Sequence, residues 1–274
     1  MESQVIESRV RQGQGQSPGR FLAAVPSPAA PRKPDSRLES VRGEAMRRLF
    51  PKSRDARDRQ GTVALRLYAY LAEATTIEDL ERRLRVPARY PTELVEEVRL
   101  HDGRAVLVRP VLPSDAPLHR AFVRSLSTAT RRNRFHGGVT DLPDAVLRYL
   151  TEVDYVTHLA LVGEVDDASG TRQVAEARWV RRSDEPDCAD FAIAIADDHQ
   201  HGGLGNFMLD QLQRSAAAKG IRRLSGDVLH NNQRMLGWLE ARGWRMTRDP
   251  HDVGVVCAEV PLETADAREW REAA

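Results

Sequence analysis

The sequence has few cysteines, few lysines and no long apolar run. Cys188 and Cys257 are the only two thiols in 274 residues, and neither lies in a CxxC pair or at a metal-ligand spacing. This scarcity is typical of a reducing compartment and argues against a disulfide framework, a redox role or a zinc site. No apolar stretch approaches the roughly 20 residues of a membrane-spanning helix. We therefore expect a soluble protein that does not enter a membrane.

The N-terminus also lacks a secretory signal, because it carries Glu2 and Glu7 instead of a basic segment followed by an apolar one. We expect a cytoplasmic protein. Residues 1–60 hold 13 Lys+Arg against 7 Asp+Glu, but only two aromatic residues, Phe21 and Phe50. With so few rings to stack on bases, a nucleic-acid partner is the weakest of the functional hypotheses.

Composition divides the chain into four parts. Residues 1–37 are rich in Pro, Gly and Arg, and we predict a disordered tail. Apolar residues at helical spacing between 38 and 84 predict a helical extension, with a linker that ends near residue 90. Residues 97–262 form the main domain, and 263–274 a C-terminal tail.

Within the main domain, strand and helix patterns alternate. Period-two alternation predicts strands at 104–110, 158–165, 173–181, 189–196, 222–229, 244–247 and 253–260. Helical spacing predicts helices at 114–126, 142–150, 204–219 and 232–242. Three consecutive strands joined by short polar turns indicate an antiparallel meander. The order predicts a mixed α/β sheet with helices on its faces.

A glycine-rich loop lies between a predicted strand and a predicted helix. Residues 200–205 read QHGGLG, and the helix begins near Leu204. Glycines at a helix N-terminus let backbone N–H groups approach an anion, and the helix dipole favours a phosphate there. The Walker pattern is excluded because no lysine is near. The dinucleotide pattern GxGxxG would place Met208 where a small residue is needed.

The loop resembles the Q/RxxGxG/A coenzyme A loop of the GNAT superfamily of acyl-CoA N-acyltransferases. Three further segments sharpen the resemblance: FVRSLS at 122–127 with Arg134-Phe135, ADFA at 189–192, and NQRML at 232–236 leading to Gly243-Trp244. Together they are most similar to the acetyltransferase domain of bacterial Pat-type protein lysine acetyltransferases. The resemblance implies a GNAT-like mixed, mostly antiparallel central sheet flanked by helices.

The resemblance also implies acetyl-CoA as cosubstrate, with no metal, and an amine acceptor. The backbone of the strand before the loop would pair with the pantetheine arm, the loop would hold the diphosphate, and a helix-start asparagine would bond the coenzyme. The residues so implied are Ile193, Ala194, Ile195, Gln200, His201, Gly202, Gly203, Leu204, Gly205, Asn206 and Asn232. Two alternatives stay open: Asn232 is an ordinary helix cap, and the Ala192–Ala194–Ala196 face packs closely against a helix.

Acetyl transfer to an amine requires removal of a proton from a group whose pKa is about 10.4 for lysine. Asp190 stands where the Pat-type family carries its general-base glutamate, and Glu176 on the adjacent strand is the substitute base. The alternatives are a solvated acid at Asp190 and an acid on an exposed polar strand face at Glu176. Where many relatives have an acidic tyrosine, this chain has Leu239, so we expect no dedicated proton donor to the leaving thiolate.

We discount a metal site at Asp197, Asp198, His199 and His201, because the expected phosphate would occupy the same loop. The basic residues Arg131, Arg132 and Arg134 either border the site or form a solvated helix face, and Trp238 and Trp244 are expected in the core. The sequence thus predicts an N-acetyltransferase acting preferably on protein lysine side chains. A small-amine acetyltransferase and a non-catalytic acyl-CoA-binding module remain as alternatives.

Overall fold

The computed structural model describes residues 36–49, 68, 71–72, 76, 80, 90–167, 170–249 and 252–263. Its centre is one eight-stranded sheet in the order β1-β2-β3-β4-β5-β6-β8-β7. Neighbouring strands are antiparallel except β5 and β6, which are parallel. The strands are β1 Glu96–Arg99, β2 Ala105–Pro110, β3 His158–Asp167, β4 Gly170–Arg181, β5 Cys188–Ile195, β6 Arg223–Leu229, β7 Arg245–Arg248 and β8 Val255–Pro261.

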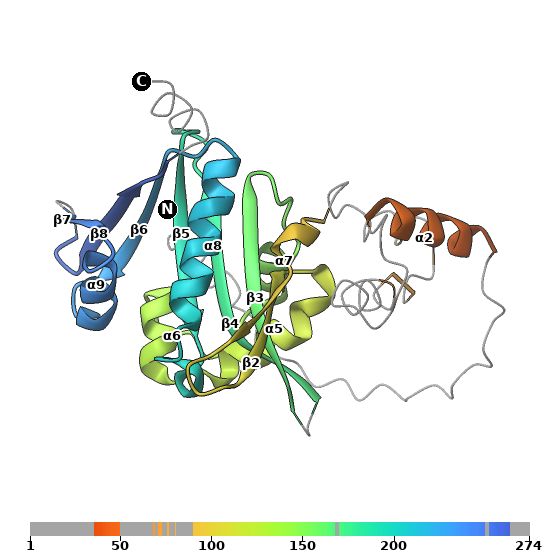
Figure 1. Cartoon of the computed structure of the whole chain (residues 1–274), viewed down its shortest axis with the longest axis horizontal. Helices are drawn as coiled ribbons and strands as arrows, with labels where there is room; N and C mark the ends of the chain where they lie inside the picture. Colours follow the sequence, from red (N-terminus) through yellow and green to blue (C-terminus); the bar gives the residue numbers. More distant parts are fainter. Residues whose placement is uncertain are drawn as a thin grey trace, which may run out of the picture.

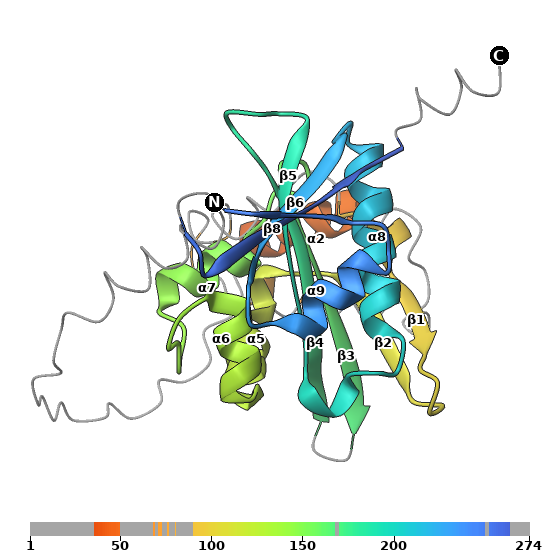
Figure 2. The same ribbon diagram turned by 90° about the vertical axis from the view of Figure 1, so that its left-hand side faces the viewer.

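Helices cover both faces of this sheet, as Figures 1 and 2 show. Helix α8 lies on one face, while α5, α6 and α7 lie on the other, and α9 stands beside β6 and β8. Their bounds are α5 Ala116–Ser125, α6 Thr128–Phe135, α7 Asp144–Thr151, α8 Leu204–Ala218 and α9 Gln233–Glu240. None of these helices, nor any other in the described part of the chain, is long and apolar enough to cross a bilayer.

Side-chain alternation along β4 explains which helix covers which face. Trp179 is fully buried and donates its indole N–H to Ser215 Oγ of α8 at 3.0 Å. Arg178, one residue earlier, points to the opposite face and donates to the Leu150 carbonyl of α7 at 3.2 Å. Because successive strand residues face opposite sides, β4 sends apolar bulk toward α8 and charge toward α5, α6 and α7.

The predicted fold class is confirmed, including the antiparallel meander β3-β4-β5. Every predicted strand and helix of the main domain has a counterpart whose ends differ by a few residues. The sequence analysis gave no range for α6, and it missed β1, a short, mostly exposed strand whose EEVR sequence has little apolar alternation. Helix α2 spans Ser36–Leu49. Residues 1–35 of the tail predicted at 1–37, residues 264–274 of the tail predicted at 263–274, and most of residues 50–89 of the predicted helical extension and linker lie outside the described residues.

Candidate functional site

The only parallel strand pair in the described sheet separates after three residues. β5 and β6 pair at Cys188–Asp190 against Arg223–Ser225, although β5 runs on to Ile195 and β6 to Leu229. Phe191 sits where they part: a Cβ on Gly226 would lie 2.4 Å from its ring. On its other side Phe191 packs against Trp244, with ring centroids 4.5 Å apart. The aromatic ring therefore fills the point of separation and leaves the edge of β5 open beyond it.

The open edge of β5 presents alternate backbone groups. Ala196 donates its N–H to the Val174 carbonyl of β4 at 2.8 Å. Because strand residues alternate, the polar groups of Ile193 and Ile195 point the other way, into the opening between β5 and β6. The Ile195 carbonyl accepts the side-chain amide of Gln200 at 2.9 Å. This leaves the Ile193 N–H and C=O facing the opening, where an extended ligand with amide groups has matching partners.

The loop from β5 to α8 turns its backbone toward the same opening. His201 and Gly203 both have left-handed backbones, with φ of 65° and 92°. The first helical hydrogen bond of α8 runs from the Phe207 N–H to the Gly203 carbonyl at 3.1 Å. The N–H groups of residues 204–206 precede that bond and have no acceptor within the helix. Together with the helix dipole they form an anion site.

The turn between β1 and β2 supports this loop from below. The His101 N–H donates to the Gly202 carbonyl at 3.1 Å, and the Leu100 side chain lies 3.2 Å from where a Gly202 Cβ would be. A Cβ on Gly203 would lie 3.1 Å from His101 Nε2. A side chain at either position would force Leu100 or His101 to shift by a few tenths of an ångström, and the positive φ of Gly203 favours glycine there as well.

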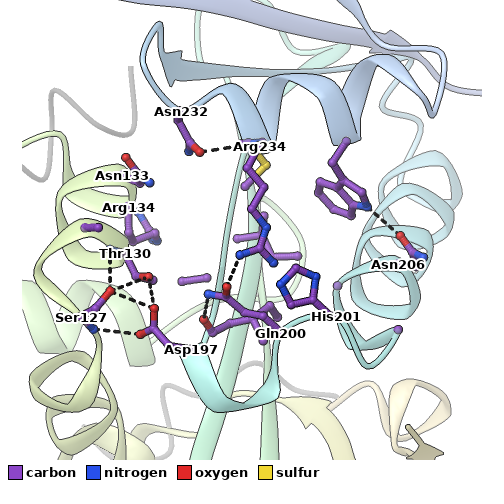
Figure 3. A pocket seen from close by; sticks show the side chains of 18 of the residues that line it. Ser127, Thr130, Asn133, Arg134, Asp197, Gln200, His201, Asn206, Asn232 and Arg234 are labelled. Atoms are coloured by element: carbon purple, nitrogen blue, oxygen red, sulfur yellow. Dashed lines mark hydrogen bonds between the residues drawn. The ribbon is translucent and has the colours of Figure 1, made fainter. Parts of the chain in front are cut away.

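These elements enclose a cavity of about 510 Å³ (Figure 3). All the predicted coenzyme-binding residues line it except Gly202, which packs on Leu100, and Leu204, whose side chain is fully buried. The cavity is also lined by His101, Arg234 and Met235, which the sequence analysis missed. His101 comes from the β1–β2 turn, which no motif marks, whereas Arg234 and Met235 lie on α9 within the NQRML segment, whose similarity did not single out these side chains.

Arg234 reaches from α9 across the opening to the loop (Figure 3). Its guanidinium donates to Gln200 Oε1, while the Gln200 amide nitrogen bonds Ile195. An exposed cation thus stands over the anion site. Asn232, at the start of the same helix, accepts the Met235 N–H at 3.3 Å and also lines the cavity, so both interpretations of this residue fit its position.

Trp238 was expected in the core, and that expectation is wrong. Its side chain is partly exposed, lines the cavity and donates to Asn206 Oδ1 at 2.7 Å. The Arg242 guanidinium lies 5.9 Å from the ring centroid. Trp244 is buried, as expected.

Helix α6 forms the opposite wall of the cavity. Asp197, just after β5, accepts the N–H and hydroxyl of Ser127, both at 2.9 Å, and the Thr130 hydroxyl at 2.8 Å. Partial burial acts to raise the pKa of Asp197, but these hydrogen bonds outweigh it and lower the pKa. The carboxylate therefore ties α6 to the loop. Among the described residues no group of three or more His, Cys, Asp or Glu is arranged to hold a metal.

Of the three candidate arginines on α6, only Arg134 lines the cavity. Arg131 donates to the carbonyls of Arg124 and Leu126, and Arg132 is exposed.

Asp190 lies at the last paired position of β5, opposite Ser225 of β6. It is 6% exposed and accepts from Arg182 at 2.7 Å, so the alternative of a solvated acid is wrong. Asp190 is not among the residues that line the cavity; it marks the point from which the two strands diverge.

Glu176 is more deeply buried than Asp190, and the alternative interpretation of Glu176, an acid on an exposed polar strand face, is also wrong. It is 1% exposed, and it accepts from Arg134 Nε at 2.7 Å and from Arg178 at 2.8 Å. Burial acts to raise the pKa of Glu176, but the two guanidiniums outweigh it and hold the pKa well below its ordinary value. A carboxylate that is so stabilised is a weak proton acceptor, and Arg134 stands between it and the cavity.

Comparison with known proteins agrees with this geometry. The model of the acetyltransferase (GNAT) family matches residues 139–244. Acetyltransferase PA5475 of Pseudomonas aeruginosa is 34% identical over 153 residues, which cover 56% of this chain and 82% of that protein. The chain belongs to the GNAT acetyltransferase family.

Other relatives connect this GNAT protein with Pat enzymes. Acetyltransferase Pat of Mycolicibacterium smegmatis is 33% identical over 169 residues, which are 62% of this chain and 49% of that protein. The crystal structure of the GNAT domain of S. lividans PAT aligns with a TM-score of 0.58 and 27% identity, covering 63% of this chain and 99% of that one. The predicted resemblance to the Pat group, and the expectation of an acyl-CoA-dependent N-acyltransferase, are confirmed.

At the position where many GNAT proteins have a tyrosine, Leu239 is fully buried on α9. The α9 side chains that reach the cavity, beyond Arg234, are Met235 and Trp238. No hydroxyl from this helix lines the cavity.

Proposed function

We propose that this GNAT protein transfers the acetyl group of acetyl-CoA to a primary amine, preferably a protein lysine side chain, by direct attack in a ternary complex. The observation that carries the proposal is the separation of β5 from β6 above the anion site of α8. Because the strands separate, the open edge of β5 and the N–H groups at the start of α8 both face one cavity of about 510 Å³. An extended ligand matches this arrangement if it carries two amides for the strand edge and a diphosphate for the N–H groups.

Each part of the cavity has a separate task in this proposal. The Ile193 N–H and C=O bind the amide-bearing arm, and the first-turn N–H groups of α8 bind the diphosphate. Arg234 adds a cation beside the loop, and the coenzyme supplies an activated thioester. Binding along β5 would orient the thioester toward the end of the cavity nearest Asp190.

Asp190 is our candidate general base. Aspartate is one methylene shorter than the glutamate of the Pat-type group, and Asp190 lies outside the cavity lining, so we expect it to act through one water. The amine nitrogen forms a C–N bond with the acetyl carbon, the C–S bond breaks with its electron pair on sulfur, and the amine proton passes to Asp190.

The preference for protein lysine rests on similarity to the Pat acetyltransferase, and a small amine is the runner-up. A specific observation favours the third candidate, a non-catalytic acyl-CoA-binding module: the candidate base is short and already paired with Arg182. The two classes differ in turnover, while both require coenzyme binding.

Calorimetry with acetyl-CoA tests the site, and mass spectrometry of acceptors tests the reaction. We expect micromolar binding that weakens roughly tenfold in Arg234→Gln, since a cation beside a phosphate is lost. Arg245→Gln, at an exposed position on β7, is the matched control and should bind as the unmodified protein does. Incubation with acetyl-CoA should add about 42 Da, an acetyl group less the hydrogen that it replaces, to lysines of a protein mixture. Binding without transfer to proteins or small amines would favour the non-catalytic module, and absence of binding would refute both.

A further inference from the structure

A buried cationic cluster stands behind one wall of the cavity. Arg134 lines the cavity from α6 and is 5% exposed (Figure 3). Its Nε donates to Glu176, and the other oxygen of that carboxylate accepts from Arg178. One carboxylate thus serves two guanidiniums, and we call Arg134, Glu176 and Arg178 the cationic cluster.

The histidines beside the cluster do not add charge near neutral pH. Burial lowers the pKa of His119 on α5 to about 4. Burial and the neighbouring Arg178 lower the pKa of His158 on β3 to about 3. With both rings neutral, the cluster carries one net positive charge.

Other charged groups near the cluster are matched or farther from the cavity. A second buried group, Arg109 with Asp115 and Glu164, carries one net negative charge, but none of its members lines the cavity. Gln173 lies opposite Glu164 in the sheet and contacts His119, which is beside the cluster, at 3.1 Å.

On the same wall Arg134 is the cation, and Asp190 is paired with Arg182. Asp197 also lines the cavity and keeps its negative charge, because its partners Ser127 and Thr130 are neutral, so its field opposes part of that of Arg134. Arg234 lies across the opening on α9, at the loop end.

The proposed transfer needs a positive charge near the sulfur atom of the coenzyme at the moment of bond cleavage. When the C–S bond breaks, the electron pair stays on sulfur, and Leu239 supplies no proton to it. We propose that the cationic cluster stabilises the departing coenzyme thiolate and so takes the place of a proton donor. This inference rests on the proposed function, and it assigns to Arg134 an electrostatic role that requires no direct contact with sulfur.

The expected size follows from the dimensions of the site. A cavity of about 510 Å³ is roughly 10 Å across, and over that distance, at an effective dielectric constant of about 20, one charge shifts a titration by about one pH unit. This is the largest shift that one charge would give: on the scale of a cysteine thiol, whose ordinary pKa is about 8.5, ionisation would move to near 7.5 in the bound state.

Binding affinity measured against pH tests this without any acceptor. If the bound thiol has the lower pKa, binding releases a proton, and coenzyme A should bind more tightly as pH rises through this window. Desulfo-coenzyme A, which lacks the sulfur, provides the reference. We expect the ratio of its Kd to that of coenzyme A to rise severalfold, at most about tenfold, between pH 6.5 and 9.5.

Charge variants at one position identify the source of the effect. Arg134→Gln should abolish the rise and Arg134→Lys should retain most of it. Arg134→Met is a second charge-removing variant, whose apolar side chain suits the buried position. Arg132→Gln removes the same charge from the exposed side of α6 and should leave the rise intact.

A ratio that does not change with pH in the unmodified protein would overturn the proposal. A rise that persists in Arg134→Gln or Arg134→Met would overturn it too, because the field would then come from other groups. Failure of both ligands to bind is a different result, which refutes the proposed function itself.

Discussion

At the scale of single residues, the two candidate carboxylates have different surroundings. Asp190 has a partly exposed partner, Arg182, and lies at the apex of the strand separation. Glu176 has two buried arginine partners and lies behind Arg134. The sequence placed both acids on adjacent strands and ranked Asp190 first by resemblance, but it did not show how their surroundings differ, because Arg134 reaches Glu176 from a helix 42 residues away. We therefore assign proton transfer to Asp190 and charge balance to Glu176.

Asp190→Asn should lower kcat/KM for a lysine acceptor by roughly a hundredfold or more, because the amide cannot accept the amine proton. The Kd for acetyl-CoA should change less than twofold, since Asp190 does not line the cavity. Steady-state kinetics and calorimetry measure the two quantities. Asp190→Glu restores the carboxylate and should remain active. Full activity in Asp190→Asn would exclude Asp190 as the base.

At the scale of elements, local pattern predicted most of the sheet and the loop. Alternation predicted the meander, and the glycines of residues 200–205 predicted the start of α8. Two contacts of the site did not follow from local pattern, although Arg234 lies within the NQRML segment. The β1–β2 turn supports the loop through His101, about a hundred residues away in sequence, and α9 sends Arg234 to Gln200 over 34 residues. Such contacts depend on how the elements pack, which periodicity does not encode.

The separation of β5 from β6 depends on one glycine. Gly226→Ala would place a methyl group 2.4 Å from the Phe191 ring, so the ring or the strand must move. We expect the free energy of unfolding to fall by about 1–3 kcal/mol, together with weaker acetyl-CoA binding. Urea unfolding and calorimetry measure both effects.

Two variants control for the general effect of adding a methyl group. Gly237→Ala lies on α9 with nothing within 4 Å of the new Cβ, and it should be neutral or stabilise by up to about 1 kcal/mol. Adding Phe191→Leu to Gly226→Ala should recover part of the loss, because the smaller side chain makes room. A Gly226→Ala protein as stable as the original would show that the ring does not hold the strands apart.

At the scale of the whole molecule, buried polar groups join three helices to one face of the sheet. Arg134 of α6 bonds Glu176, 42 residues away in sequence, and Arg178 donates to the Leu150 carbonyl of α7, 28 residues away. Gln173 contacts His119 of α5, 54 residues away. Sequence reasoning expected an exposed polar face on β4, since charged residues are seldom buried without partners. The partners are supplied only when α5 and α6 dock, so the burial of Glu176 is a property of the assembled fold.

That burial predicts loss of stability in acid. The pKa of His119 is about 4 and that of His158 about 3 in the folded protein, against an ordinary value of 6.5. Below pH 6.5 the unfolded chain therefore binds protons that the folded protein does not. The contribution of these two histidines to the free energy of unfolding is therefore most favourable above pH 6.5, and it is lost as pH falls toward 4 and then 3. The depressed pKa of Glu176 extends the loss to still lower pH.

Urea unfolding at several pH values should thus show the free energy of unfolding falling below pH 6.5 with a slope that approaches 2.7 kcal/mol per pH unit, about 1.4 for each histidine. His119→Gln keeps a polar group beside Gln173 but cannot be protonated, so the slope should fall by about half. His230→Gln, at an exposed position, should leave the slope unchanged. If His119→Gln keeps the full slope, the acid sensitivity arises elsewhere, and the neutral state assigned to this ring, on which the net charge of the cationic cluster depends, is incorrect.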